Sequence, residues 1–412
     1  MAKAEAWPLV VVGAGAAGLM AGILAARSGG RVLVLETRQV PGAKIRVSGG
    51  GRCNLLPSGA DLSSFHTEGS RNALRNILLS WALEEVRSFF ERELSIPLKV
   101  EPTGKVFPAS NSSREVVDAL LRECRRVGVV IAGGCRVEKV SRIEGGTGRG
   151  FRVDPGPGGA VECDKLLLAT GGLSLPRTGS DGTGYALARS LGHSLRATYP
   201  ALVPLLASDP AWGELSGISL RARLRAERDG RALEEREGDF LFTHRGFSGP
   251  VVLDSSRHLT APGGEKTQLL AAWLGSQAPD WEMLLKEPGK RAVITVLREH
   301  IPRRLAERLL LLSGLPESRF TSDLPREERR RLVEALTRFR LPISGNEGYG
   351  AAEVTGGGIP LEEVSPRTLE SRIVPGLYVA GEILDAVGHI GGYNFLWAWV
   401  TGRKSGLAAA GG

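Results

Sequence analysis

The chain has 412 residues and is basic, with 53 Lys and Arg against 45 Asp and Glu, a net charge of +8 and a pI near 9.5. Its apolar content of 42% and charged content of 24% are ordinary for a globular protein and exclude a disordered or fibrous chain. No apolar run is long enough for a membrane-spanning helix. The arginines are scattered among acids, so we do not expect nucleic acid as a partner.

Four cysteines stand at positions 53, 124, 135 and 163, and no two of them have the spacing of a CxxC pair. Neither a metal site nor a redox-active dithiol is therefore expected. Free thiols are typical of a reducing compartment, and no signal peptide is expected before the first predicted strand. We expect a cytoplasmic protein. The sequence carries no signal for an oligomeric state.

The first 36 residues have the pattern of a dinucleotide-binding unit. An apolar run at 9–12 predicts a buried strand, and a GxGxxG turn, a helix-forming stretch and a second strand ending in Glu36 follow it. Gly13 permits the tight turn, Gly15 lets a pyrophosphate approach the backbone, and Gly18 lets helix and strand pack closely. Glu36 stands about 20 residues after the glycines, where an acid accepts hydrogen bonds from a ribose diol. The predicted ligand-binding residues here are Gly13, Gly15, Ala16, Ala17, Gly18 and Glu36.

The stretch from Val40 to Asn54 comes directly after this acid. Three consecutive glycines at 49–51 allow the backbone to lie against a ligand, and Lys44 and Arg52 add positive charge beside a phosphate site. Asn54 can hydrogen-bond a heterocycle. A plain flexible loop would have a similar composition. Because of its position, we favour the ligand-binding interpretation, with Lys44, Gly51, Arg52 and Asn54 as candidates.

The following segment, 71–163, alternates helical and strand patterns. Helical periodicity at 71–94 predicts core residues rather than ligand contacts. The remaining patterns predict a strand–turn–strand at 97–108, a helix at 114–126, strands at 129–131 and 135–140, and a hairpin formed by 151–153 and 161–163.

A third glycine-rich stretch ends another buried strand, at Lys165–Leu168. It continues as Ala169-Thr170-Gly171-Gly172, which can bring a second backbone segment to the dinucleotide. The glycines of 178–184 then lead into a helix at 185–191. No strand and acid follow them, so we do not predict a second nucleotide site there.

The composition changes after residue 192 and changes back after residue 345. Alternating apolar and polar positions predict a β-rich part at 193–278, and Leu-, Arg- and Glu-rich helical spacing predicts a helical part at 279–342. We therefore expect an inserted domain, 193–345, between the two parts of a cofactor domain, 1–192 and 346–412. Within the insert, Thr243–Pro250 is either a substrate-facing loop that contains His244 or an ordinary hairpin turn.

The C-terminal part contains three more glycine-bearing segments. Glu353–Ile359 predicts a strand that runs into a glycine turn, and 376–382 predicts a strand that ends in Gly381-Glu382. Gly388–Asn394 precedes an apolar helix at 395–402. The N-terminus of such a helix can face the negative charge of a reduced cofactor.

Together these motifs resemble the FAD-binding flavoproteins of the BaiN/YhiN type, often labelled aminoacetone-oxidase-family or NAD(P)/FAD-dependent oxidoreductases. The resemblance rests on GxGxxG with Glu36, SGGGRCN at 48–54, EVTGGG at 353–358 and GGYN at 391–394, in order over nearly the whole chain. It implies an α/β, glutathione-reductase-like FAD-binding dinucleotide fold with an inserted β-barrel-like and helical domain.

The resemblance also implies site residues. Glu36 would hold the adenosine ribose, Val137 would meet the adenine, and Arg52, Cys53 and Asn54 would lie near the flavin. Backbone and side chains that border the phosphates, ribityl chain or isoalloxazine would come from Ala169, Thr170, Gly171, Gly381, Glu382, Asp385, Gly391, Gly392, Tyr393 and Asn394.

The expected function is that of an oxidoreductase with noncovalent FAD, linked to NAD(P)H as a transient electron donor, that reduces a small-molecule substrate such as an enone. His244 is the candidate proton donor because histidine can supply a proton near neutral pH. Three alternatives are a flavin-dependent amine oxidase, a non-catalytic or RNA-associated flavoprotein, and a disulfide reductase. The absence of a CxxxxC pair argues against the disulfide reductase.

Overall fold

The structure is a computed structural model that describes residues 6–143, 150–156, 159–287 and 289–411. It consists of two compact units, residues 1–200 with 353–412 and residues 201–352. The boundaries that composition predicted, at 193 and 345, are therefore several residues too early. The reason is that β11 (Arg196–Ala201) and β19 (Val354–Gly358), which flank the insert, pair with each other.

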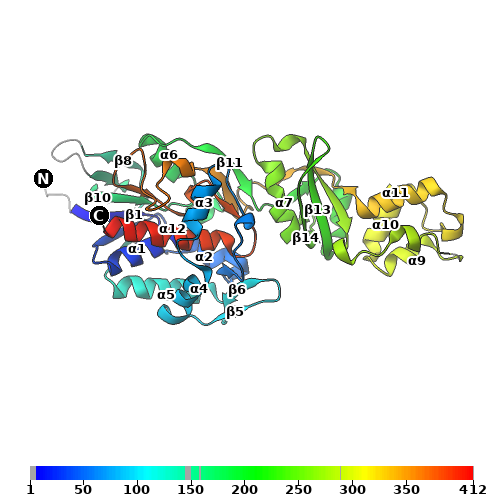
Figure 1. Ribbon diagram of the computed structural model, residues 1–412, viewed down its shortest axis with the longest axis horizontal. Helices are drawn as coiled ribbons and strands as arrows, with labels where there is room; N and C mark the ends of the chain where they lie inside the picture. The colour runs from blue at the N-terminus through cyan, green and yellow to red at the C-terminus, as the bar shows by residue number, and fades with distance from the viewer. Residues whose placement is uncertain (1–5, 144–149, 157–158, 288, 412) are drawn as a thin grey trace. The chain divides into compact units, whose positions relative to one another are not determined.

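A parallel sheet forms the centre of the first unit (Figure 1). Its strand β1 lies between β2 and β10, with Val11 opposite Val34 and Leu167. Residues 9–12 are buried, as the apolar run predicted, because both faces of a parallel sheet are covered. The parallel strands are β1 (Ala6–Val12), β2 (Val32–Glu36), β7 (Val130–Gly133), β10 (Val161–Leu168) and β20 (Leu377–Val379).

An antiparallel extension continues this sheet beyond β10. It consists of β9 (Phe151–Asp154) and β8 (Lys139–Arg142). The predicted hairpin at 151–163 is confirmed, although residues 157–158 of its turn lie outside the described residues. The strand predicted at 135–140 is wrong in its first half. Gly134 there adopts a φ of +73°, which ends β7, and β8 begins only at Lys139.

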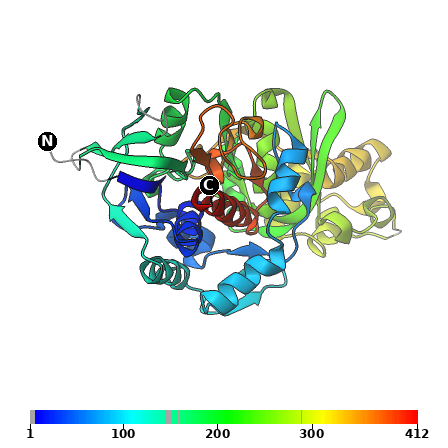
Figure 2. The ribbon, with the colours of Figure 1, turned by 60° about the vertical axis from the view of Figure 1, so that its left-hand side comes forward.

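Two helices pack closely beside this sheet. The C-terminal helix α12 (Tyr393–Ala410, red) runs beside α1 (Ala16–Arg27, dark blue), as Figures 1 and 2 show. Glycines make the approach possible, because a β-carbon on Gly402 would lie 2.4 Å from the carbonyl oxygen of Ala17. One on Gly406 would lie 2.3 Å from the carbonyl oxygen of Ala21. The apolar helix predicted at 395–402 is thus confirmed and is longer than its pattern suggested.

Shorter elements complete the first unit. The helix predicted at 114–126 is confirmed as α5, and the strand–turn–strand at 97–108 as β5 and β6. The helical pattern at 71–94 forms α3, α4 and a final π turn at Phe89–Glu93. The bounds are α2 (Ala43–Val47), β3 (Leu56–Pro57), β4 (Phe65–His66), α3 (Arg71–Leu78), α4 (Leu83–Ser88), β5 (Leu98–Val100), β6 (Lys105–Pro108), α5 (Ser113–Arg126), α6 (Thr183–Ser190) and β21 (Val387–Gly388).

The second unit is built on an antiparallel sheet with the order β17-β16-β13-β14-β15-β12-β18. Its two end strands are close in the chain, since β17 ends at Arg340 and β18 begins at Ile343, so the sheet curls like the barrel that the resemblance implied. The strands are β12 (Leu205–Ala207), β13 (Ser219–Arg228), β14 (Arg231–Phe242), β15 (Gly246–Ser248), β16 (Thr267–Trp273), β17 (Phe339–Arg340) and β18 (Ile343–Asn346).

Helices cover and extend this sheet. The helix α7 (Pro250–Thr260) lies inside the region predicted as β-rich, and its buried face packs on β13 and β14. Aromatic side chains fill the core, with Phe240, Phe247 and Trp273 fully buried. The predicted helical part is confirmed as α8 (Trp281–Leu284), α9 (Val293–Arg298), α10 (Arg303–Leu312) and α11 (Arg326–Thr337). Among the described residues, no helix is both long enough and apolar enough to cross a membrane.

The glycine contacts of α12 generate a stability prediction. We expect Gly406→Ala to destabilise the first unit by about 1–3 kcal/mol, because its methyl group would overlap the backbone of α1. Thermal unfolding followed by tryptophan fluorescence would show a melting temperature several degrees lower. Gly59→Ala is the control, since no described atom lies within 4 Å of a β-carbon built there. Equal melting temperatures for the two variants would contradict the packing argument.

Candidate functional site

The glycine turn between β1 and α1 has three different glycine positions. Gly13 has a φ of +103°, and a β-carbon there would lie 2.5 Å from the carbonyl oxygen of Ala169. A β-carbon on Gly18 would lie 1.9 Å from the carbonyl oxygen of Gly13. By contrast, no described atom lies within 4 Å of a β-carbon on Gly15. Protein packing therefore requires glycine at 13 and 18, whereas the space at 15 is open to a ligand.

This open space faces the N-terminus of α1. Gly15 is the N-cap residue, and no side chain of the described residues caps the helix. The first N–H groups of the helix are thus available to an anion, which the helix dipole also attracts. The residues of this turn therefore fit a pyrophosphate, and its binding there stays a prediction.

Glu36 lies at the end of β2 and is 8% exposed. Its Oε2 accepts a hydrogen bond of 2.6 Å from the N–H of Ala14, and its Oε1 accepts one of 2.8 Å from the N–H of Arg38. The carboxylate is therefore fixed against the glycine turn, and each oxygen keeps a lone pair for a ribose hydroxyl. The N–H of Cys135 donates to the carbonyl oxygen of Glu36 at 2.8 Å, which brings the segment of the buried Val137 to this side.

A polar network lies at the ends of β10 and β20. Lys44 Nζ donates to Ser174 Oγ and to Glu382 Oε2, both at 2.5 Å. Glu382 Oε1 accepts from Ser174 Oγ at 2.7 Å and from the N–H of Thr355 at 3.0 Å. Four segments that are far apart in sequence thus meet here. Of these residues, the sequence had predicted Lys44 and Glu382 as candidates and had missed Ser174 and Thr355.

Gly381 connects this network to the glycine turn. It has a φ of +83°, and a β-carbon there would lie 2.9 Å from Ala17 Cβ in the first turn of α1. The hydroxyl of Thr401 on α12 accepts from the N–H of Gly381 at 3.0 Å and fixes its position. Ala169 contacts the same turn through Gly13, and Thr170 and Gly171 follow it towards Ser174. These candidates therefore gather around one edge of the sheet.

The SGGG segment forms a strained loop beside this edge. Gly49, Gly50 and Gly51 all have positive φ, and so does Cys53, at +60°. A non-glycine residue in this conformation is rare and costs free energy. The buried Oδ1 of Asn54 has no hydrogen-bond partner among the described residues. An orphaned acceptor of this kind fits a ligand with a donor group, such as a flavin ring or a ribityl hydroxyl.

Two candidate residues of this loop, Arg52 and Cys53, interact with other parts of the protein. The guanidinium of Arg52 pairs with Glu101 and lies 4.0 Å from the ring centroid of Phe107. The thiol of Cys53 is fully buried, and that burial raises its pKa to about 12. We therefore assign no redox role to Cys53.

The segment before α12 is shaped by its own side chains. Gly391 and Gly392 have φ of +119° and +97° and lead into the helix at Tyr393. The amide of Asn394 exchanges two hydrogen bonds of 2.8 Å with the backbone of Gly388. Its side chain therefore closes this loop, while the helix N-terminus beside it remains suited to negative charge.

Asp385 is also held by protein groups. It is 2% exposed, accepts from Thr67 Oγ1 at 3.0 Å and from the N–H of Glu68 at 3.1 Å, and lies 3.1 Å from Arg196 Nε. Burial raises the pKa of Asp385 to about 6, although these partners act in the opposite direction. Its carboxylate ties β4, β11 and the loop after β20 together, so a direct cofactor contact of this side chain stays a prediction.

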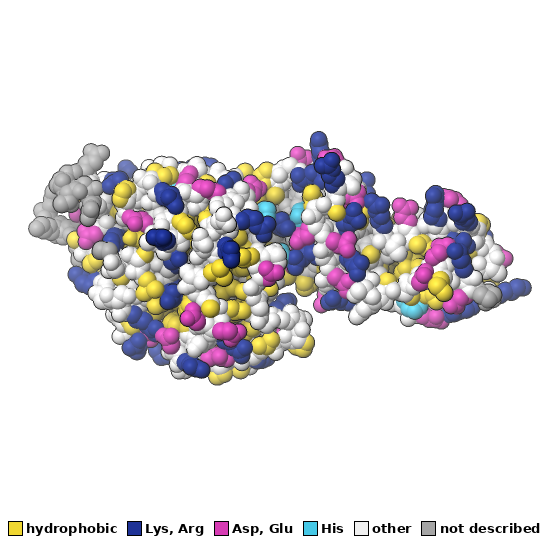
Figure 3. All heavy atoms as spheres, viewed as in Figure 1, with side chains coloured by type: hydrophobic (Ala, Val, Ile, Leu, Met, Phe, Trp, Pro, Cys, Tyr) yellow, Lys and Arg dark blue, Asp and Glu magenta, His cyan; other side chains and the backbone are white. Residues whose placement is uncertain are grey.

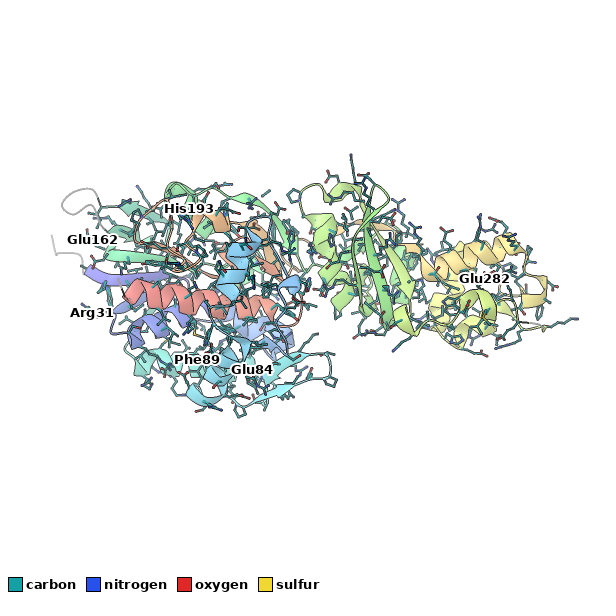
Figure 4. The ribbon with its side chains drawn as sticks, viewed as in Figure 1. Arg31, Glu84, Phe89, Glu162, His193 and Glu282 are labelled. Carbon is teal, nitrogen blue, oxygen red and sulfur yellow. The ribbon has the colours of Figure 1, made fainter. Side chains whose placement is uncertain are left out.

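His193, labelled in Figure 4, forms an arrangement that resembles a hydrolytic triad. Its Nδ1 lies 2.7 Å from Glu363 Oε2, and its Nε2 lies 2.9 Å from Ser371 Oγ. However, Ser371 is buried, and its oxygen accepts from the N–H groups of Ile373 and Val374. The hydroxyl is fully used by the protein and is not open to a substrate, so we interpret the group as structural.

His244 belongs to the second unit. It is exposed in the turn between β14 and β15, where Thr243 Oγ1 accepts from the N–H groups of Arg245 and Gly246. The segment is therefore a hydrogen-bonded hairpin turn, as one of the two interpretations expected. Its contact with substrate stays a prediction.

Comparison with known proteins adds full-length relatives. The sequence profile of the HI0933-like protein Rossmann domain matches residues 8–408. The chain is 35% identical over 406 residues to a ribosomal RNA dihydrouridine synthase of Escherichia coli (strain K12), covering 96% of both chains. It is also 35% identical over 411 residues to a 3-dehydro-bile acid delta(4,6)-reductase of Clostridium scindens, covering 97% of this chain and 98% of the relative. A ribosomal RNA dihydrouridine synthase of Haemophilus influenzae is 31% identical over 408 residues, covering 97% of each.

Two solved structures share the fold at low sequence identity. A 3-ketosteroid-delta4-(5alpha)-dehydrogenase from Rhodococcus jostii RHA1 is 16% identical with a TM-score of 0.52, covering 99% of this chain and 97% of that one. The open conformation of a flavocytochrome c3 fumarate reductase is 17% identical with a TM-score of 0.50, covering 98% and 78%. These likenesses support the α/β dinucleotide-binding fold that the sequence predicted.

The open space at Gly15 generates a binding prediction. Gly15 has φ −81° and ψ −167°, which alanine can adopt, so we expect Gly15→Ala to fold normally. Its methyl group would overlap a bound pyrophosphate and weaken FAD binding by about 10- to 100-fold, the usual cost of overpacking. Gly18→Ala should instead destabilise the fold, because its methyl group overlaps Gly13. Wild-type FAD affinity in Gly15→Ala, measured by flavin fluorescence, would place the phosphates elsewhere.

The cysteines generate a reactivity prediction. Burial raises the pKa of Cys53, Cys124 and Cys163 to about 12, so thiolate is scarce at these positions near neutral pH. Cys135 is only partly buried. We expect a thiol-reactive dye at about pH 8, near the ordinary pKa of a thiol, to modify only Cys135 in the native protein and all four cysteines after unfolding. Rapid native labelling of Cys53 would contradict this assignment.

Proposed function

This chain belongs to the HI0933-like family, and from that membership we propose that it is an FAD-dependent oxidoreductase that reduces a carbon–carbon double bond conjugated to a carbonyl group. The observation that carries the proposal is the open phosphate cradle at Gly15, with Glu36 fixed beside it. The orphaned Oδ1 of Asn54 supports a ring or ribityl donor at the other end of the ligand.

The relatives' activities have this chemistry in common. Dihydrouridine differs from uridine by saturation of a carbon–carbon double bond that is conjugated to a ring carbonyl. A 3-dehydro-bile acid with double bonds at positions 4 and 6 has them conjugated to the ketone at position 3. In uridine and in the unsaturated bile acid, the carbonyl polarises the double bond. Hydride therefore adds at one carbon and a proton adds at its neighbour. We propose the same class of substrate for this chain.

The cofactor and the protein would have different tasks in this reaction. Bound FAD would supply the hydride, and the protein would supply orientation, electrostatics and the proton. We propose His244 as the proton donor and NAD(P)H as the transient electron donor. Asn54 and the N-terminus of α12 would orient the isoalloxazine and favour its reduced form.

An RNA-bound uridine is the second candidate substrate. It is favoured by the names of two full-length relatives and by the charge distribution. The first unit carries 30 basic and 24 acidic residues, whereas the second carries 23 and 21. On the visible face in Figure 3, however, basic and acidic side chains are interspersed. The small-molecule enone therefore remains our first candidate, and the experiment below distinguishes the two.

The test separates the two half-reactions. Under anaerobic conditions, the bound flavin would be reduced with NADH or NADPH and then mixed with a conjugated steroid enone, a matched steroid with an isolated double bond, and unmodified ribosomal RNA. Rapid reoxidation by the enone alone supports a small-molecule reductase, and reoxidation by RNA with formation of dihydrouridine supports the second candidate. Reduction of the flavin by amines, without reoxidation by any conjugated substrate, would overturn the proposal.

The proton donor is tested on the same system. We expect His244→Asn to keep its FAD and its rate of reduction but to slow reoxidation by the accepted substrate by about 10²- to 10⁴-fold, the usual effect of a positioned acid. His300→Asn, an exposed histidine of the same unit, is the control. Unchanged reoxidation in His244→Asn would remove this residue from the mechanism.

A further inference from the structure

We propose that Lys44 and Glu382 tune the reduction potential of the bound flavin in opposite directions, with Lys44 favouring the reduced form. The inference rests on the proposed function, because it assumes FAD in the site. It assigns a task to the ion pair, in which Lys44 Nζ and Glu382 Oε2 are 2.5 Å apart.

The topology places this pair at the flavin end of the ligand. Glu36 ends β2 on one side of β1, whereas the segments after β10 and β20 lie on the other side. The phosphate cradle at Gly15 lies at the end of β1, between them. A dinucleotide whose ribose is held by Glu36 must therefore extend across the cradle towards Ser174 and Glu382. Its second half, the flavin, then reaches the Lys44 network.

The hydrogen bonds of the pair are asymmetric. Glu382 uses one oxygen for Lys44 and the other for Ser174 and Thr355. Lys44 uses two of its three donors within the described residues, for Ser174 and Glu382, so one remains for a ligand. The pair therefore presents a cationic donor to its surroundings, next to the lone pair that Glu382 Oε2 keeps.

The low exposure and close packing of the pair strengthen its electrostatic effect on a nearby flavin. The side chains of Lys44 and Glu382 are only 23% and 16% exposed, so water screens their charges less than on an open surface. The network is also closely packed, because a β-carbon on Gly172 would lie 2.4 Å from Thr355 Oγ1 and 2.9 Å from Glu382 Oε1. Fixed charges of this kind act on a nearby redox group without reorganisation.

The sign of the effect follows from the charge balance. A hydride donor delivers two electrons and one proton, so the flavin gains one negative charge if no second proton follows. A cation at Lys44 stabilises that charge, and the anion of Glu382 opposes it. Removal of the cation should therefore lower the potential, and removal of the anion should raise it.

A purely structural role predicts a different result. The pair also ties the segment of α2 to the loops after β10 and β20, and its loss could loosen the whole site. Loosening would weaken FAD binding in both single variants, and it would not move their potentials in opposite directions. The direction of each shift therefore distinguishes the two roles.

The experiment measures the potential of the FAD-loaded protein by equilibration with a reference dye. Lys44→Met should decrease the ratio of reduced to oxidised flavin at a fixed potential by about tenfold, which is about 30 mV for a two-electron couple. Glu382→Gln should increase the ratio by a similar factor, and the double variant should return close to the wild type. Lys99→Met, on β5, is the matched control and should leave the potential unchanged.

The measurements distinguish a failure of this inference from a failure of the proposed function. FAD affinity is measured first, by fluorescence titration of each variant. Wild-type protein that binds no FAD would overturn the proposed function and this inference together. FAD-loaded variants whose potentials stay unchanged, or shift in the same direction, would overturn the inference alone.

Discussion

The close contact between the first turn of α1 and the backbone of Gly13 is the constraint on which the rest of the site depends. Because Gly18 has no side chain, the helix lies directly against the turn, and its free N–H groups reach the edge of the sheet. The same absence of side chains at Gly402 and Gly406 brings α12 against α1. Two helices, one near each end of the chain, therefore pack together beside the proposed phosphate cradle, and Thr401 of α12 fixes Gly381 close to Ala17 of α1.

Around this cradle the protein arranges its charges in two different ways. Among the described residues, Glu36 is held by backbone N–H groups alone, so it keeps acceptor capacity for neutral hydroxyls. Glu382, by contrast, accepts from the Lys44 ammonium group as well as from Ser174 and Thr355. Similar carboxylates thus serve different purposes, because one is left as an acceptor and the other serves to hold a cation. The reason lies in their neighbours and cannot be found in either residue alone.

Much of the cofactor unit could be predicted from the sequence, because its signals are local. The apolar strand, the glycine spacing and the acid at Glu36 lie within one short stretch, and the structure places them as expected. The roles of Ser174 and Thr355 could not be predicted, since they depend on contacts between segments about 180 residues apart.

The helix α7 was missed because it begins at Pro250, directly after a predicted turn, inside an alternating region. The resemblance implied that Asn394 borders the flavin, which stays a prediction. The two hydrogen bonds between its amide and the backbone of Gly388 could not be read from the sequence, because they depend on the fold of the loop before α12.

The pairing of β11 with β19 has an evolutionary consequence. The chain leaves the first unit and returns to it on two neighbouring strands, and Gly356 accommodates the ring of Tyr199 between them. An insertion whose two ends are adjacent can be lengthened, replaced or diversified without disturbing the host sheet. The first unit can therefore be kept unchanged while the segment between the two strands is exchanged.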